Sequence, residues 1–82
     1  MPWFVYLVRC RDGSLYTGTT TDPPSRLRAH NSGRGAKYTR ARAPVTLVHV
    51  EAAAGRAAAL RRERTIKHWP RARKERLLLA AP

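Results

Sequence analysis

The sequence predicts an α+β protein whose elements follow the order strand, strand, helix, strand, helix, helix (ββαβαα). Two β-rich runs flank Asp12-Gly13, a dipeptide that is typical of hairpin turns. Residues 56–68 are rich in Ala, Leu and Arg, which favour helices. With 82 residues, the chain is expected to form one small domain over residues 1–82, with a modest core.

The hairpin and the first helix follow from residue types. Trp3 to Cys10 is mostly apolar, aromatic and β-branched, which predicts a strand. Ser14 to Thr20 is rich in Thr and Tyr and predicts its antiparallel partner. Thr21 or Asp22 can cap the next helix, in which Pro23 suits the first position.

The middle of the chain is basic. The first helix is expected to end near Ser32, with Gly33 at its exit. Residues 33–42 are expected to form a basic loop suited to lie along a phosphate backbone. Val45 to Val50 alternates apolar and polar residues, which predicts the third strand.

Two helices are expected to complete the chain. The second covers about Arg56 to His68, after Gly55, and Pro70 ends or redirects it. The third covers Arg71 to Ala80 and is basic on its outer side.

The charge indicates a polyanionic partner. The net charge is +12, from 17 Lys and Arg against five acids, and most of the cations are Arg. Codon usage and solubility could account for part of this excess, but nucleic acid is the better expectation. Arg grips phosphate through a bidentate fork, which Lys cannot do.

Several protein classes are excluded. No apolar run approaches the roughly 18 residues that span a membrane. The N-terminus lacks the pattern of a secretory signal. The lone Cys10 cannot form an internal disulfide and is expected to be a small buried hydrophobe, so a reducing cytoplasm is the default location.

Glu63 is the most informative acid. At about 100° per residue, it lies in the middle of an apolar helix face with Ala59 and Ile66. A carboxylate there is costly unless it is paired or binds a cation. It could form a structural ion pair with Arg26 or with Lys67, its i,i+4 neighbour. It could equally bind Mg²⁺, which often takes one carboxylate, waters and substrate phosphate.

Arg26 and His30 are four residues apart and should share one helix face. Arg26 could hold a scissile phosphate, and His30 could move a proton or bind phosphate. A solvated basic face is the alternative, and it would be the commoner outcome for such a pair alone.

Tyr6 and Tyr16 lie in the two hairpin strands. A phenol has a pKa of about 10 and needs nearby positive charge to act as a base. Simple packing in the strands is the alternative. A two-residue turn at Asp12-Gly13 would pair Tyr6 with Thr19 and send the tyrosines to opposite faces. A shared site requires a loop with an odd number of residues, or a bulge.

Other candidates rank lower. His49 and His68 are expected to be packed or exposed, and Trp3 and Trp69 to lie in or beside the core. Glu51 is the rival carboxylate.

Several segments, in order, resemble the GIY-YIG nuclease superfamily. Val5-Tyr6-Leu7 and Leu15-Tyr16-Thr17-Gly18 resemble its two triplets. The first lacks Gly-Ile, and Thr17 stands for isoleucine in the second. Pro23-Pro24-Ser25 replaces a helix-favouring run, and none of these departures removes a catalytic group. A closer resemblance, to small stand-alone bacterial members, lies in residues 16–22, 26–33, 35–40 and 59–67.

The resemblance implies a three-stranded antiparallel sheet flanked by helices, the GIY-YIG endonuclease fold. It implies hydrolysis of nucleic-acid phosphodiester bonds with one divalent cation, Mg²⁺ or Mn²⁺. The motif tyrosines correspond to Tyr6 and Tyr16, the helix arginine to Arg26 and the metal-binding glutamate to Glu63. His30 matches a position that is histidine in some branches.

The resulting hypothesis is a metal-dependent endonuclease of low sequence specificity that acts on nucleic acid, with DNA as the expected substrate and RNA left open. Glu63 would hold the cation, Tyr6 would take the proton of the attacking water, and Arg26 would stabilise phosphoryl charge. Tyr16 would orient the phosphate or water, and His30 would assist. The basic loop and last helix would supply affinity. The expected nucleic-acid-binding residues are Arg34, Lys37, Tyr38, Arg40, Arg42 and Lys67.

Two alternatives remain open from the sequence. The chain could be a non-catalytic nucleic-acid-binding module that retains the fold. It could also be a nuclease subunit that a partner protein delivers to its target.

Overall fold

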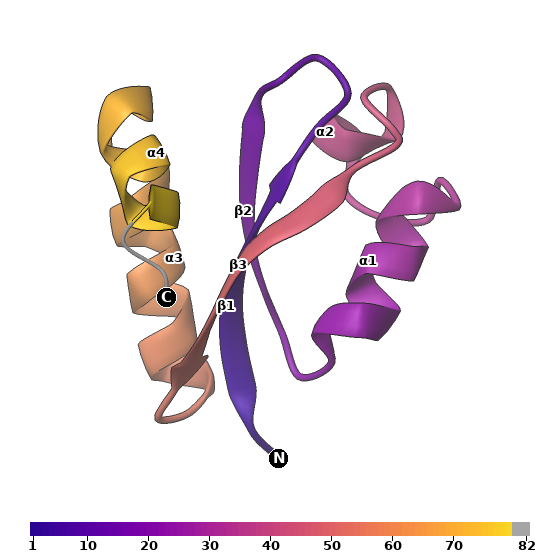
Figure 1. Cartoon of the computed structure of the whole chain (residues 1–82). Coiled ribbons are helices and arrows are strands. Elements are labelled where there is room, and N and C mark those ends of the chain that lie inside the picture. Colours follow the sequence, from indigo (N-terminus) through magenta and orange to yellow (C-terminus); the bar gives the residue numbers. More distant parts are fainter. Residues whose placement is uncertain (80–82) are drawn as a thin grey trace.

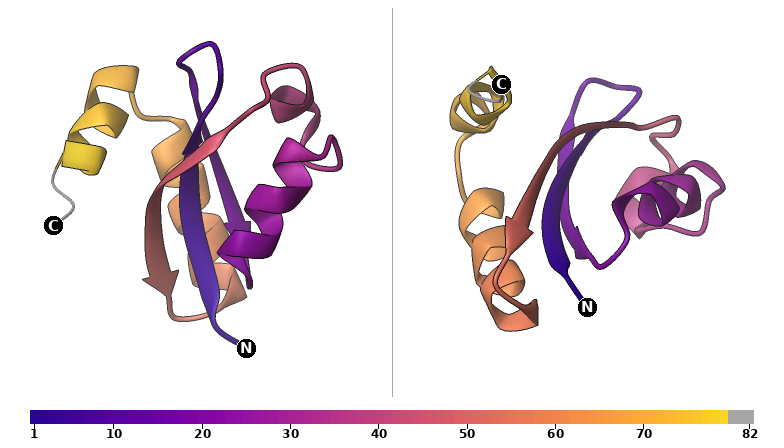
Figure 2. Two further views of the ribbon diagram at one scale, coloured as in Figure 1. Left: turned by 45° about the vertical axis from the view of Figure 1, so that its right-hand side comes forward. Right: turned by 60° about the horizontal axis from the view of Figure 1, so that its bottom comes forward.

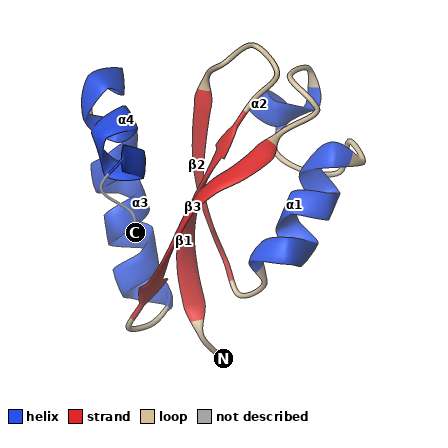
Figure 3. Cartoon of the chain, in the orientation of Figure 1, coloured by secondary structure: helices blue, strands red, loops and turns tan. Residues whose placement is uncertain are grey.

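Three antiparallel strands form a sheet in the order β2-β1-β3, with helices on both sides (Figure 1). The computed structural model describes residues 1–79, so the predicted helix end at Ala80 lies outside the described residues. The elements, shown by type in Figure 3, are β1 (Trp3–Arg9), β2 (Leu15–Thr20), α1 (Pro23–Asn31), α2 (Lys37–Arg40), β3 (Thr46–Ala53), α3 (Arg56–Lys67) and α4 (Arg71–Leu79). The predicted α+β class and the flanked antiparallel sheet are confirmed.

The β1–β2 hairpin places both motif tyrosines on one face of the sheet. Tyr6 pairs with Gly18 and Val8 pairs with Tyr16, so the two-residue turn that would pair Tyr6 with Thr19 is wrong. The loop has three residues, because the backbone N–H of Gly13 bonds to the carbonyl of Cys10 at 2.9 Å. Gly13 has φ 87°, the left-handed conformation that such a loop requires.

Residues of β1 alternate between two cores. Val5 and Leu7 face α3 and pack with Ala59 and Ile66. Tyr6, Val8 and Cys10 face the other way and pack with Val45, and with Leu27 of α1. Figures 1 and 2 show α1 and α2 on one side of the sheet and α3 and α4 on the other. The side chain of Tyr6 therefore points toward α1.

The helices largely follow the prediction, with one correction. Asp22 caps α1, since its Oδ1 accepts the backbone N–H of Ser25 at 3.2 Å. The stretch 33–42 is not wholly a loop, because one helical turn, α2, forms within it. Its Thr39 is fully buried and fastens the segment to the core. No helix in the described part of the chain is long and apolar enough to cross a membrane.

The third strand is longer than predicted. The alternation predicted an end at Val50, but β3 continues to Ala53, which pairs with Trp3 of β1. Pairing with the central strand therefore extends β3 beyond its alternating segment, and Glu51 lies inside the strand instead of ending it.

One side chain of the α3-facing core, Thr17, carries a buried hydroxyl. Thr17 lies opposite Leu7 on the α3 face and is 3% exposed. Its hydroxyl has no hydrogen-bond partner among the described residues. An unsatisfied buried hydroxyl costs free energy, which a methyl group of similar shape would not.

Thr17→Val should therefore raise the free energy of unfolding by about 1 kcal/mol, as measured by urea denaturation. Thr39→Val is the matched control, because the Thr39 hydroxyl is satisfied, and it should lower the same quantity by about 1–3 kcal/mol. Equal losses in both variants would contradict this account.

Candidate active site

A buried hydrogen bond joins the sheet to α1. The hydroxyl of Tyr6 lies 2.7 Å from Nε2 of His30. Tyr6 is 2% exposed and His30 is fully buried. A buried pair of this kind must satisfy its polar atoms internally, so the remaining partners of His30 determine its protonation.

Thr39 assigns the tautomer of His30. Nδ1 of the ring lies 2.7 Å from Oγ1 of Thr39. That hydroxyl donates its single proton to the carbonyl of Ala36 at 2.9 Å. Thr39 therefore accepts a hydrogen bond from the Nδ1–H of His30, which leaves Nε2 as an unprotonated acceptor. The proton of Tyr6 points toward Nε2.

The surroundings keep both rings neutral. Burial lowers the pKa of His30 below its ordinary 6.5, and the positive charge of Arg26 lowers it further. Burial raises the pKa of Tyr6, although Arg26 opposes this shift by a hydrogen bond and by its charge. At neutral pH, Tyr6 holds its proton and His30 can accept one.

Arg26 completes the α1 side of the site. It precedes His30 by one turn, and its Nε donates to the Tyr6 hydroxyl at 3.4 Å. The shared helix face predicted for Arg26 and His30 is confirmed, since both reach that hydroxyl. Pro24 does not disturb the first turn, because the backbone N–H of Arg26 bonds to the carbonyl of Asp22 at 3.0 Å.

Tyr16 begins a stack of aromatic and cationic groups. Its ring meets that of His30 edge-on, with 5.4 Å between centroids. Tyr38 of α2 stacks on Tyr16 at 5.9 Å, and the guanidinium of Arg42 lies 3.9 Å from the Tyr38 ring. The ammonium of Lys67 lies 5.5 Å from the Tyr16 ring. Positive charge thus borders both tyrosines.

Glu63 approaches this site from α3. Its side chain is 19% exposed and pairs with Lys67 at 3.6 Å, whereas no ion pair joins it to Arg26 among the described residues. Its negative charge helps to raise the pKa of Tyr6. The structural pairing with Lys67 is present, and the ammonium of Lys67 in turn lies 5.5 Å from the Tyr16 ring.

The donor set fits one kind of cation. No group of three or more His, Cys, Asp or Glu side chains gathers within residues 1–79. Glu63 would therefore offer a cation one half-buried carboxylate. Mg²⁺ and Mn²⁺ accept oxygen ligands, and Mg²⁺ commonly keeps several waters and binds substrate phosphate. A single carboxylate, together with water and a substrate phosphate, would suit such a cation.

Other sequence candidates lie elsewhere. Glu51 of β3 binds Arg62 and His49, and so serves as a structural ion pair. His68 is exposed and bonds to the carbonyl of Arg64.

The predicted nucleic-acid contacts divide into two groups. Arg34, Lys37 and Arg40 are exposed. Arg42 is half-buried, and it binds Asp12 at 3.1 Å and the carbonyl of Tyr38 at 2.8 Å. Arg42 therefore anchors the hairpin loop to α2, whereas the exposed cations are available to phosphate.

The sequence reasoning missed three residues of this site. A Cβ at Gly18 would lie 2.5 Å from the Tyr6 oxygen, so only glycine leaves room for the tyrosine. A Cβ at Gly35 would overlap the ring of His30 in the same way. Thr39 sets the tautomer. Gly35 and Thr39 both lie in the 35–40 segment, but only the fold connects them to His30.

The family described as the GIY-YIG catalytic domain matches residues 2–76 of this chain. The chain belongs to this family. A UPF0213 protein of Haloquadratum walsbyi is 57% identical over 74 residues, which is 90% of this chain and 83% of that protein. A UPF0213 protein of Staphylococcus haemolyticus is 47% identical over 75 residues, 92% of each.

Two solution NMR structures have the same fold. One is a UPF0213 protein from Bacillus halodurans, with TM-score 0.61 and 47% identity. The other is a protein from E. faecalis, with TM-score 0.64 and 42% identity. Each alignment covers 95% of this chain and 83% of the other chain. The GIY-YIG fold that the motifs predicted is thus confirmed over nearly the whole chain.

The buried His30 predicts a pH dependence of stability. Its folded pKa is depressed, so below its ordinary 6.5 the unfolded chain binds a proton that the folded ring does not. The free energy of unfolding should fall as pH drops from about 7 to about 5, before the acids with lowered pKa values begin to protonate.

Urea denaturation across this range measures the effect. His30→Gln should remove most of the fall, whereas the control His68→Gln, at an exposed position, should retain it. The same slope in His30→Gln as in the unmodified protein would rule out His30 as the source.

Gly18→Ala should push the Tyr6 ring away from His30. The added methyl would overlap the tyrosine, and overpacking of this kind costs about 1–3 kcal/mol of stability. A double-mutant cycle with Tyr6→Leu tests the cause, because removal of the ring should abolish most of the cost. An unchanged cost in the Tyr6→Leu background would place the strain elsewhere.

Proposed function

We propose that this GIY-YIG protein is a metal-dependent endonuclease that hydrolyses nucleic-acid phosphodiester bonds with low sequence specificity, and that DNA is its substrate. The observation that carries this proposal is the position of Glu63, which pairs at 3.6 Å with Lys67, whose ammonium lies 5.5 Å from the Tyr16 ring. Family membership supports a nuclease-type fold, and the residues around Glu63 support the chemistry.

The other acids are occupied by structural contacts. Of the five acids in the sequence, Asp12 accepts from Ser14 and Arg42, and Asp22 caps α1. Glu51 binds Arg62 and His49, and Glu75 binds Arg9 and Arg71. Glu63 has only the 3.6 Å contact with Lys67 within the described residues. It is the acid best able to take a cation as a ligand.

Glu63 would hold the divalent cation, Mg²⁺ or Mn²⁺, together with water and substrate phosphate. When bound, the cation supplies positive charge to the scissile phosphate. Arg26, whose guanidinium already approaches Tyr6, would stabilise charge on the phosphoryl oxygens.

Tyr6 and His30 would act together on the attacking water. The oxygen of Tyr6 would take a proton from the water while its own proton moves to Nε2 of His30, 2.7 Å away. This transfer forms an imidazolium, and the Nδ1–H stays bound to Thr39. His30 is required because burial raises the pKa of Tyr6 and opposes a free phenolate. Tyr16 would orient the phosphate or water.

The exposed cations would supply affinity. Arg34, Lys37 and Arg40, with Tyr38 and Lys67, would contact the sugar–phosphate backbone, a contact that carries little sequence information. A partner protein could supply specificity. We place the activity in the cytoplasm, because the lone Cys10 is a buried free thiol.

A second candidate is a nucleic-acid-binding module without catalysis. The burial of Tyr6 and His30 favours it, because an attacking water must reach the tyrosine oxygen. In that case their hydrogen bond serves stability alone.

Glu63→Gln separates the candidates. Labelled DNA and RNA structures are incubated with Mg²⁺, Mn²⁺ or EDTA. The nuclease proposal predicts metal-dependent cleavage that falls at least about 10²-fold in the variant, with binding and melting temperature retained. Glu51→Gln is the control, because it removes a structural carboxylate and should lower the melting temperature while cleavage persists. Cleavage unchanged in Glu63→Gln would exclude the metal-ligand role.

Tyr6→Phe should lower the cleavage rate by roughly 10²- to 10⁴-fold, the usual contribution of a general base. Tyr16→Phe should cost less, and part of its cost should appear as weaker substrate binding, because Tyr16 lies on the edge strand within the cationic stack. Single-turnover rates and binding constants, measured separately, distinguish the two. Equal losses in rate alone would refute unequal roles.

A further inference from the structure

A groove lies at the junction of α3 and α4, away from the tyrosines. It has a volume of about 240 Å³ and is lined by Trp69, Arg73, Arg76 and Leu77. Figure 2 shows α4 on the α3 side of the sheet, whereas α1 lies on the other side. The groove shares no lining residue with the Tyr6–His30 site.

The lining combines an aromatic ring with cations. Arg73, Arg76 and Leu77 have i, i+3 and i+4 spacing and share one face of α4. The guanidinium of Arg73 lies 4.2 Å from the centre of the Trp69 ring, and that of Arg62 lies 5.1 Å from it. An indole bordered by guanidinium groups attracts both planar and anionic groups.

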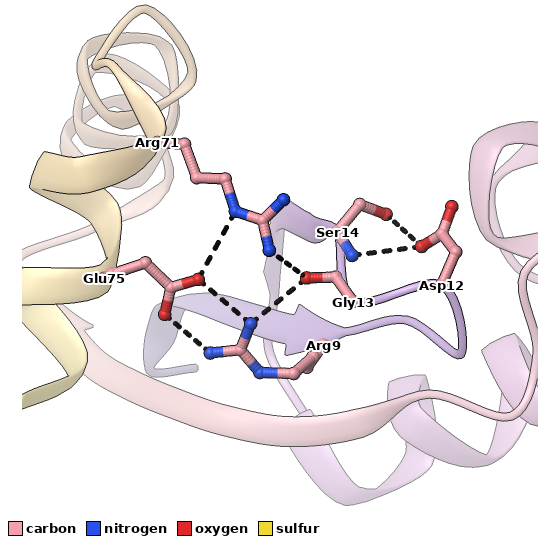
Figure 4. A network of polar contacts seen from close by, with 6 residues as sticks. All are labelled: Arg9, Asp12, Gly13, Ser14, Arg71 and Glu75. Carbon is pink, nitrogen blue, oxygen red and sulfur yellow. Dashed lines mark hydrogen bonds and ion pairs between the residues drawn. The ribbon is translucent and has the colours of Figure 1, made fainter.

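The single acid of α4 points away from this face. Glu75 forms a two-pronged contact with Arg9, at 2.7 and 3.0 Å, and also pairs with Arg71 (Figure 4). Both arginines donate to the carbonyl of Gly13 in the hairpin loop, at 3.1 and 2.8 Å (Figure 4). This network fixes α4 against the hairpin and holds the groove in shape.

The network also leaves the groove positively charged. Arg73 and Arg76 are exposed, and no ion pair joins either of them to a carboxylate among the described residues. An anion that enters the groove therefore meets two guanidinium groups without displacing an acid. Trp69 and Leu77, both half-buried, supply the apolar part of the lining.

We propose that the groove binds one nucleotide of a single-stranded segment: the base replaces the guanidinium of Arg73 over the Trp69 ring and packs on Leu77, and the phosphate binds Arg73 and Arg76. The identification of the bound strand as nucleic acid rests on the proposed function. The volume is below the roughly 300–1,000 Å³ of typical small-molecule sites, which suits one unit of a longer strand. Aromatic stacking and cations are the usual means of binding single strands. An acidic protein segment would also bind the arginines, but it would offer no planar group to replace Arg73 over the indole.

Trp69 itself reports on the groove. The chain has two tryptophans, so Trp3→Phe leaves Trp69 as the sole indole fluorophore. A single-stranded oligothymidylate of about 12 nucleotides is titrated in EDTA, which separates binding from cleavage. Fluorescence should be quenched with saturation, and anisotropy of the labelled strand should give the same affinity.

Matched double variants separate the groove from net charge. Arg73→Gln/Arg76→Gln should weaken binding about 10-fold and abolish the quench. Arg61→Gln/Arg64→Gln removes the same charge from exposed positions of α3 and should retain the quench, with a smaller loss of affinity. The proposal is overturned if the strand binds without quenching Trp69, if the two double variants behave alike, or if polyglutamate competes as well as the strand.

The result is independent of the nuclease assay. Quenching of Trp69 fluorescence without strand cleavage would support the groove proposal and count against the proposed function. Strand cleavage without quenching would support the proposed nuclease function and refute nucleotide binding in the groove.

Discussion

The hydrogen bond between Tyr6 and His30 is the interaction on which the rest of the site depends. It crosses the interface between the central strand and α1, where both side chains are buried. Gly18 and Gly35 lack side chains where a Cβ would overlap these two rings. The helical turn α2 carries Thr39, whose hydroxyl accepts a hydrogen bond from Nδ1 of the His30 ring. One pair of polar atoms thus explains two glycines, a short helix and a buried hydroxyl.

The scarcity of acids in a chain of net charge +12 gives each carboxylate a visible role. Asp12 and Glu75 fasten the hairpin to α2 and α4, and Glu51 joins β3 to α3. The excess of arginines creates repulsion between the positively charged elements, and these ion pairs offset that repulsion locally. Glu63 differs because its contact within the described residues is the 3.6 Å pair with Lys67, whose ammonium lies 5.5 Å from the Tyr16 ring. The outward surfaces are left cationic, as a polyanion-binding protein requires.

Much of this arrangement was predictable from the sequence, because local patterns encode it. Strand composition and Asp12-Gly13 predicted the hairpin, and the cap at Asp22 predicted α1. The loop length was not predictable, since Gly13 can serve either a two-residue or a three-residue turn and tertiary packing selects between them. The role of Thr39 depends on a side chain nine residues earlier, across a turn. Such a contact leaves no periodic signal in the sequence.

The tautomer of His30 tests the central claim most directly. Two-dimensional ¹H–¹⁵N NMR of the imidazole nitrogens at about pH 7 distinguishes a protonated Nδ1 from a protonated Nε2. We predict a neutral ring with the proton on Nδ1 and an unprotonated Nε2 that accepts the Tyr6 hydroxyl proton. A proton on Nε2, or an imidazolium at this pH, would contradict the account, because His30 could then accept nothing from Tyr6.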